Sequence, residues 1–137
     1  METLFFTFNQ NNSGGRFEIN LKKGIAEYVI IEAVNAKQAN SKAGDIGIYF
    51  EGCEGGLDCS CCGDRWYSLD DDDGKKEPSI YGTNVYEYKN SFWSSTACIH
   101  RINKPIETPI NKSVTRIIII VAINGINCFK PSLKRCL

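Results

Sequence analysis

Apolar residues that alternate with polar ones dominate the start of the chain, and this pattern favours a β-sheet. In residues 4–8 and again in residues 17–21, every second residue is Leu, Ile or Phe. That period of two is typical of a strand with one buried face. Residues 11–15, Asn-Asn-Ser-Gly-Gly, are turn formers. The two alternating segments are therefore predicted to form a β-hairpin.

Further strand signals follow along the chain. Residues 25–34 are apolar and rich in β-branched side chains with less strict alternation, which predicts an inner strand. The most apolar strand signal spans residues 114–123, and the Asn124-Gly125 dipeptide after it is typical of a type I′ turn. The remaining predicted strands are shorter and cover residues 85–88, 97–102 and 126–129.

One segment between these strands predicts a helix. Asn35 with Gln38 forms a capping pair, and the residues that then share one helical face are Ala36, Ala39, Ala43 and Ile46, before Gly47 ends the pattern. With 137 residues, the chain is predicted to be a single domain, residues 1–137. We expect an α+β fold in which an antiparallel-rich sheet of about six or seven strands packs with one or two helices.

Charge and composition exclude some classes of function. The net charge is zero, so no overall positive field attracts long nucleic acid. Residues 1–77 hold eight Lys/Arg and fourteen Asp/Glu, whereas residues 78–137 hold eight and two, giving −6 and +6. The longest apolar run, residues 117–123, is far shorter than the roughly 20 residues that span a bilayer. No signal peptide or membrane segment is predicted, and the seven cysteines are expected to be mostly reduced or bound to metal.

Cysteine spacing suggests a zinc site. Cys59 and Cys62 bracket a turn that ends in Gly63, which is the spacing of a zinc knuckle. A structural zinc needs four ligands, and Cys98 with His100 are the preferred further pair because positions i and i+2 of a strand share a face. The other candidates for these two places are Cys53, Cys61, Cys128 and Cys136. The alternatives are reduced, packed cysteines or a redox pair at Cys59 and Cys62.

A second candidate site follows directly after the cysteines. Arg65, Trp66 and Tyr67 are the residue types that hold a phosphate and stack on a base, and they predict a clamp for an anionic nucleotide. The loop containing Asn11, Asn12 and Ser13 would close over the anion; the alternative is that these residues only cap the core. His100 is the only histidine and no paired-carboxylate motif is present outside the acidic loop at residues 70–73, so the sequence favours a binding protein over an enzyme.

Two stretches, FNQNNSGG at residues 8–15 and DCSCCGDRWY at residues 58–67, resemble small uncharacterised proteins of tailed bacteriophages, with a looser likeness at residues 78–82. Ser60 stands where such proteins often have Pro. The resemblance implies the cytoplasm of an infected bacterium and a host protein or defence nucleotide as partner. We expect a non-enzymatic, homo-oligomeric counter-defence protein that sequesters a small anionic nucleotide signal. The alternative is a zinc-stabilised module that inhibits a host protein.

Overall fold

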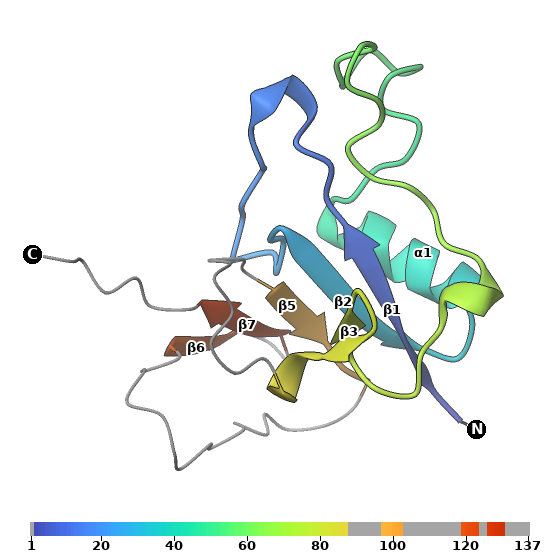
Figure 1. Cartoon of the computed structure of the whole chain (residues 1–137), viewed down its shortest axis with the longest axis vertical. Coiled ribbons are helices and arrows are strands. Elements are labelled where there is room, and N and C mark those ends of the chain that lie inside the picture. Colours follow the sequence, from blue (N-terminus) through green and yellow to red (C-terminus); the bar gives the residue numbers. More distant parts are fainter. Residues whose placement is uncertain (1, 88–96, 103–118, 124–125, 131–137) are drawn as a thin grey trace, which may run out of the picture.

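The computed structural model describes residues 2–87, 97–102, 119–123 and 126–130, the last two ranges by their backbone only. Its described part is an α+β fold in which one helix lies against a mixed sheet (Figure 1). The sheet has the order β1-β2-β5-β7-β6, and a separate two-stranded sheet holds β3 and β4. The strands are β1 (Leu4–Asn9), β2 (Tyr28–Ala33), β3 (Ser79–Ile80), β4 (Thr83–Asn84), β5 (Ala97–His100), β6 (Ile119–Ile123) and β7 (Ile126–Lys130).

The partner of β1 differs from the sequence-based expectation. β1 pairs antiparallel with β2, with Phe6 opposite Ile31 and Phe8 opposite Val29. Residues 17–21 form no strand in the described structure and take part only in an isolated bridge at Asn20. The predicted hairpin is therefore wrong. Its alternating apolar residues do not pair with a strand of the sheet, and Ile19 is exposed.

The predicted inner strand is confirmed, because β2 lies between β1 and β5. Its pairing with β5 is parallel, whereas the other neighbouring pairs of this sheet are antiparallel. The fold class and the antiparallel bias thus agree with the sequence, but the part of the chain that the structure describes does not support a single sheet of six or seven strands. The prediction of a strand at residues 85–88 is also wrong, since Val85–Glu87 is a short 3-10 helix. Residues 114–118 and the predicted turn at 124–125 lie outside the described residues.

Helix α1 (Ala36–Ile46) begins and ends where the sequence predicts. The Asn35 side chain accepts a hydrogen bond from the Gln38 amide at 2.9 Å, and the Gln38 side chain accepts one from the Val34 amide at 3.0 Å. The first bond satisfies an amide that an uncapped helix start leaves without a partner, and the second ties the residue before the N-cap to the first turn. Gly47 ends the helix with φ 106°, a left-handed conformation that glycine adopts without strain. No helix in the described ranges is long and apolar enough to cross a membrane.

Both faces of β1 and β2 are covered. One face carries Phe6, Phe8 and Ile31 against the alanine face of α1, and Trp66 belongs to the same core. The opposite face carries Phe5 and Ile30, which pack with residues of β3 and β5. Because β1 and β2 are rigidly buried, the loops that leave their ends on the side of Asn9 and Tyr28 start from fixed points.

Candidate functional site

Two long segments, residues 10–27 and 51–66, extend from the same end of the molecule and lie side by side (Figure 1). The amide of Asn11 donates to the carbonyl oxygen of Arg65 at 2.8 Å, and the Asn11 side chain donates to the carbonyl oxygens of Cys62 at 2.8 Å and Asp64 at 3.1 Å. The Ser13 hydroxyl accepts from the Cys59 amide at 3.0 Å. Segment 10–27 therefore supports the cysteine loop, which we define as residues 51–66.

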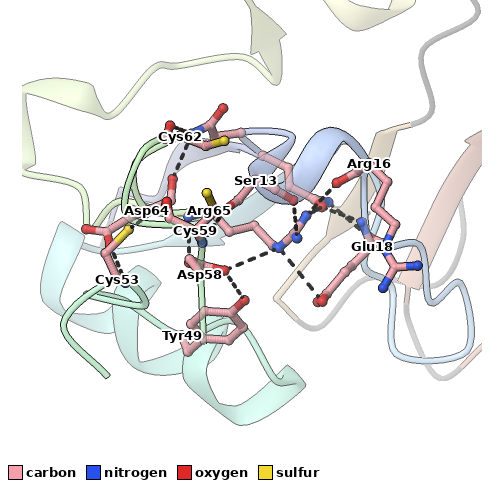
Figure 2. Close-up of polar contacts among 12 residues, drawn as sticks. Ser13, Arg16, Glu18, Tyr49, Cys53, Asp58, Cys59, Cys62, Asp64 and Arg65 are labelled. Atoms are coloured by element: carbon pink, nitrogen blue, oxygen red, sulfur yellow. Dashed lines mark hydrogen bonds and ion pairs between the residues drawn. The ribbon is translucent and has the colours of Figure 1, made fainter. Parts of the chain in front are cut away.

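Asp58 organises the interior of the cysteine loop. Its carboxylate accepts hydrogen bonds from the Tyr49 hydroxyl and from the Arg65 amide, each at 2.7 Å (Figure 2). The carbonyl oxygen of Gly52 accepts from the amides of Leu57 and Asp58 at 2.8 and 3.0 Å. A Cβ at Gly52 would overlap the Asp58 carboxylate, so only glycine fits there. The loop is thus held by its own polar contacts rather than by an apolar core.

Arg65 joins the two segments from within. Its guanidinium donates to the carbonyl oxygens of Ser13 and Arg16, both at 2.8 Å, and to the Gln10 side chain at 3.0 Å. Its Nε lies 3.6 Å from Asp58 and 3.8 Å from Glu18, the carboxylates that balance the charge. Figure 2 shows the guanidinium pointing into this group. We call Arg65 with these five partners the Arg65 network.

The residues predicted to clamp a nucleotide are therefore not arranged as a clamp. Arg65 and Trp66 are only 5% and 2% exposed, the first in the Arg65 network and the second in the core under α1. Tyr67 is exposed, and so is Asn12, whereas Ser13 is buried. Because a buried guanidinium already bonded to carbonyl oxygens has no free face for a phosphate, the structure gives Arg65 a supporting role.

Three cysteines meet at the surface of the loop. The sulfurs of Cys59 and Cys61 lie 2.7 Å apart, those of Cys61 and Cys62 lie 3.7 Å apart, and all three fall within 4.8 Å of one another. A turn brings them together, in which the Cys62 amide donates to the Cys59 carbonyl oxygen at 3.0 Å. Gly63 follows with φ 87°, a value that favours glycine. We call Cys59, Cys61 and Cys62 the thiol cluster.

Hydrogen bonds within the thiol cluster give Cys59 a lower pKa than Cys61. Donation from the Cys61 thiol and backbone amide, and then from Cys62, lowers the pKa of Cys59 to about 7. The same contact with Cys59 raises the pKa of Cys61 to about 11, because its proton is held between the two sulfurs. Cys59 is thus the member of the thiol cluster that ionises first, and a cation would have to displace the protons of the other two.

Two of the expected zinc ligands do not join the thiol cluster. Cys98 is buried in β5 and its sulfur is in a disulfide whose partner lies outside the described side chains. A disulfide sulfur offers no thiolate to zinc, so the expectation of reduced cysteines fails at Cys98. The Nε2 atom of His100 donates to the carbonyl oxygen of Gly24 at 2.9 Å. Burial lowers the pKa of His100.

The sequence prediction named Cys61 only as an alternative ligand and preferred Cys98 and His100 to it. A zinc-knuckle template counts only positions i and i+3, here Cys59 and Cys62, and assigns no role to the residues between them. In the structure the turn is tight, and the Cys61 sulfur lies 2.7 Å from the Cys59 sulfur and 3.7 Å from the Cys62 sulfur. Three cysteines within four residues were the available signal. Cys53 lies apart, with its thiol donating to the Cys59 carbonyl oxygen at 3.4 Å.

The thiol cluster can bind a soft metal ion. Thiolates prefer Zn²⁺ and Cu⁺, and tetrahedral Zn–S bonds of about 2.3 Å place two sulfurs about 3.8 Å apart. The 3.7 Å between Cys61 and Cys62 matches this spacing, and the 2.7 Å between Cys59 and Cys61 would have to open by about 1 Å. A rotation of one exposed side chain supplies such a change.

Comparison with known proteins gives one match. A family model described as "Domain of unknown function (DUF7296)" matches residues 3–112. No curated protein and no solved structure matches the chain. The matched range contains the thiol cluster and the whole Arg65 network.

Proposed function

Because this chain belongs to the DUF7296 family of unknown function, we propose its function from the site alone: the thiol cluster binds a zinc ion, and the cysteine loop docks on another protein. The observation that carries the proposal is the convergence of three free thiols at one exposed turn. The thiolate is the form of cysteine that binds metal, and soft thiolate ligands select zinc and cuprous ions.

The fourth coordination position is the part of the site that points to a partner. Among the described residues, the group that converges consists of three cysteines, whereas structural zinc sites in proteins have four ligands. Cys53 is engaged with a backbone carbonyl oxygen, and Cys98 is in a disulfide. The described residues supply no fourth ligand to this group, and we propose that a Cys, His or carboxylate side chain of the bound protein provides it.

Exposed apolar side chains flank the thiol cluster and suit a docking surface. Leu57 and Tyr67, close to the cluster in the chain, are 68% and 56% exposed. Tyrosine is enriched in protein interfaces, and the exposed Leu57 would add apolar contact area. We propose a protein of the bacterial host as the partner and the host cytoplasm as the location, following the resemblance to bacteriophage proteins.

The Arg65 network gives the docking loop a fixed shape before it binds. A loop already ordered loses less conformational entropy on binding than a mobile one. Five contacts of the guanidinium hold segment 10–27 and the cysteine loop together at their base. The buried arginine thus supports the proposed function without touching the partner.

Metal analysis tests the zinc proposal. Protein purified in reducing buffer with added Zn²⁺, then dialysed, is expected to retain about one zinc per chain by elemental mass spectrometry. Cys61→Ser is expected to lose most of it, whereas Cys53→Ser, a matched change outside the cluster, is expected to keep it. Less than half an equivalent in the wild type, or equal loss in both variants, would contradict the proposal.

Nucleotide binding remains a prediction, as does the homo-oligomer. Arg65 and Trp66, the two principal contacts predicted for the nucleotide, are buried. Of the other predicted contacts, only Asn12 and Tyr67 are well exposed. Calorimetric titration with cyclic and ADP-ribose-type nucleotides tests it directly. Saturable binding that Tyr67→Ala abolishes would favour this function over zinc-dependent docking.

A further inference from the structure

We propose that the thiol cluster is also an oxidation site, at which a hydroperoxide converts Cys59 and Cys61 into a reversible disulfide. The sulfur separations carry this inference. The Cys59 and Cys61 sulfurs are 2.7 Å apart and need to close by only about 0.7 Å to reach the disulfide bond length of about 2.05 Å. The Cys61 and Cys62 sulfurs, at 3.7 Å, are less favourably placed.

Access to an oxidant distinguishes the thiol cluster from the other described cysteines, Cys53 and Cys98. Cys61 is exposed and Cys59 is partly exposed, so a small peroxide reaches both sulfurs without a conformational change. Cys53, although free, has its thiol directed at the Cys59 carbonyl oxygen. Cys98 is fully buried. Oxidation is therefore expected to be selective for the thiol cluster.

The reaction balances with hydrogen peroxide as the oxidant. One sulfur of the pair attacks a peroxide oxygen, the O–O bond breaks, and a sulfenic acid and one water form. The second sulfur then attacks the sulfenic sulfur, the S–O bond breaks, and the hydroxyl group leaves as a second water with the proton of the second thiol. Two thiols and one peroxide thus give one disulfide and two waters, with two electrons passing from sulfur to oxygen.

Disulfide formation and zinc binding exclude each other. Zinc requires the Cys59 and Cys61 sulfurs to move apart to about 3.8 Å, whereas the disulfide requires them to close to about 2.05 Å. A disulfide would leave Cys62 as the sole thiolate of the cluster. This regulatory consequence rests on the proposed zinc binding, but the oxidation itself does not. Exposed disulfides are readily reduced, so thiol reductants would restore the site.

Peptide mapping tests the oxidation. The stretch between Lys42 and Arg65 contains no other tryptic site, so one peptide, residues 43–65, holds the four free cysteines of the described side chains. Reduced, metal-free protein is treated with hydrogen peroxide, alkylated, denatured and digested. Wild-type peptide is expected to carry two alkyl groups instead of four, and Cys62→Ser and Cys53→Ser one instead of three. Dithiothreitol before alkylation should restore the full number.

Variants identify the bonded pair. Cys61→Ser is expected to form no disulfide in this peptide after peroxide and to lose at most the one alkylation site that is oxidised to a sulfenic acid, and so is Cys59→Ser. If Cys61→Ser loses two alkylation sites as completely as wild type, the disulfide involves another cysteine and the proposal is overturned. Oxidation to sulfinic acid without any disulfide would overturn it as well.

A parallel measurement separates this proposal from zinc binding. Zinc-loaded protein is treated with peroxide while a chromogenic chelator reports released metal, and release is expected to rise together with disulfide formation. If the protein never retains zinc yet forms the disulfide, zinc binding fails and oxidation stands. If it retains zinc but forms no disulfide in either state, oxidation fails and zinc binding stands.

Discussion

Replacing Arg65 with alanine tests whether this residue supports the structure. The change deletes three hydrogen bonds, at 2.8, 2.8 and 3.0 Å, and leaves two carbonyl oxygens without their donor. It also removes the cation 3.6 Å from Asp58, whose side chain is fully buried. Loss of one partner from a buried ion pair costs about 3–5 kcal/mol, and the hydrogen bonds belong to the same group, so their energies are not added.

The assay is reversible urea unfolding, supported by thermal unfolding. A loss of about 3–5 kcal/mol is expected to lower the melting temperature by roughly 10–15 °C in a domain of this size. Arg65→Lys keeps the charge but not the forked donors, and should lose less. Arg16→Ala is the matched control, because the exposed Arg16 contributes to the Arg65 network only through its carbonyl oxygen, and it should change stability by less than about 0.5 kcal/mol. If the free energy of unfolding of Arg65→Ala lies within 1 kcal/mol of the wild-type value, as expected for the loss of an exposed side chain, the supporting role is refuted.

Three further predictions follow from the site and the fold. In metal-free protein, alkylation of Cys59 should rise with pH around a midpoint near 7, whereas Cys61 should respond near 11; a shared midpoint in peptide-resolved alkylation would contradict the hydrogen-bond assignment. The lowered pKa of His100 means that the unfolded chain takes up a proton first as pH falls below about 6.5, so the free energy of unfolding should fall from pH 7 to pH 5. His100→Gln should reduce that slope in urea titrations, and an unchanged slope would count against it. Gly52→Ala should cost about 1–3 kcal/mol because its Cβ overlaps a buried carboxylate, whereas Gly55→Ala, with its nearest atom at 3.7 Å, should cost less than half as much.

The features that the sequence predicted well are those determined by neighbouring residues. The start of α1 depends on Asn35 and Gln38, three residues apart, and its end on Gly47, so a short window contains the cause. The inner position of β2 follows in the same way from its continuous apolar character. Each of these predictions needed no knowledge of a distant partner.

The features that failed depend on contacts between distant parts of the chain. Alternation in residues 17–21 indicates a strand, but it does not name the partner, and β1 instead pairs with β2. Arg65 has the side chain of a phosphate ligand, yet its direction is decided by carbonyl oxygens of residues 13 and 16, about fifty positions earlier. The thiol cluster was predicted in part, because the knuckle spacing selected Cys59 and Cys62 but gave no reason to prefer Cys61 over Cys98 and His100.

The joining of two segments by one buried arginine has a consequence for protein engineering. A synthetic peptide that copies only residues 51–66 would lack the carbonyl oxygens of Ser13 and Arg16 and the amide group of Asn11, so it should not keep the cysteine turn in shape. A graft onto another scaffold would need both stretches, anchored at two neighbouring strand ends. Outer positions such as Leu57 could then be randomised to select new targets while the anchoring arginine is left unaltered.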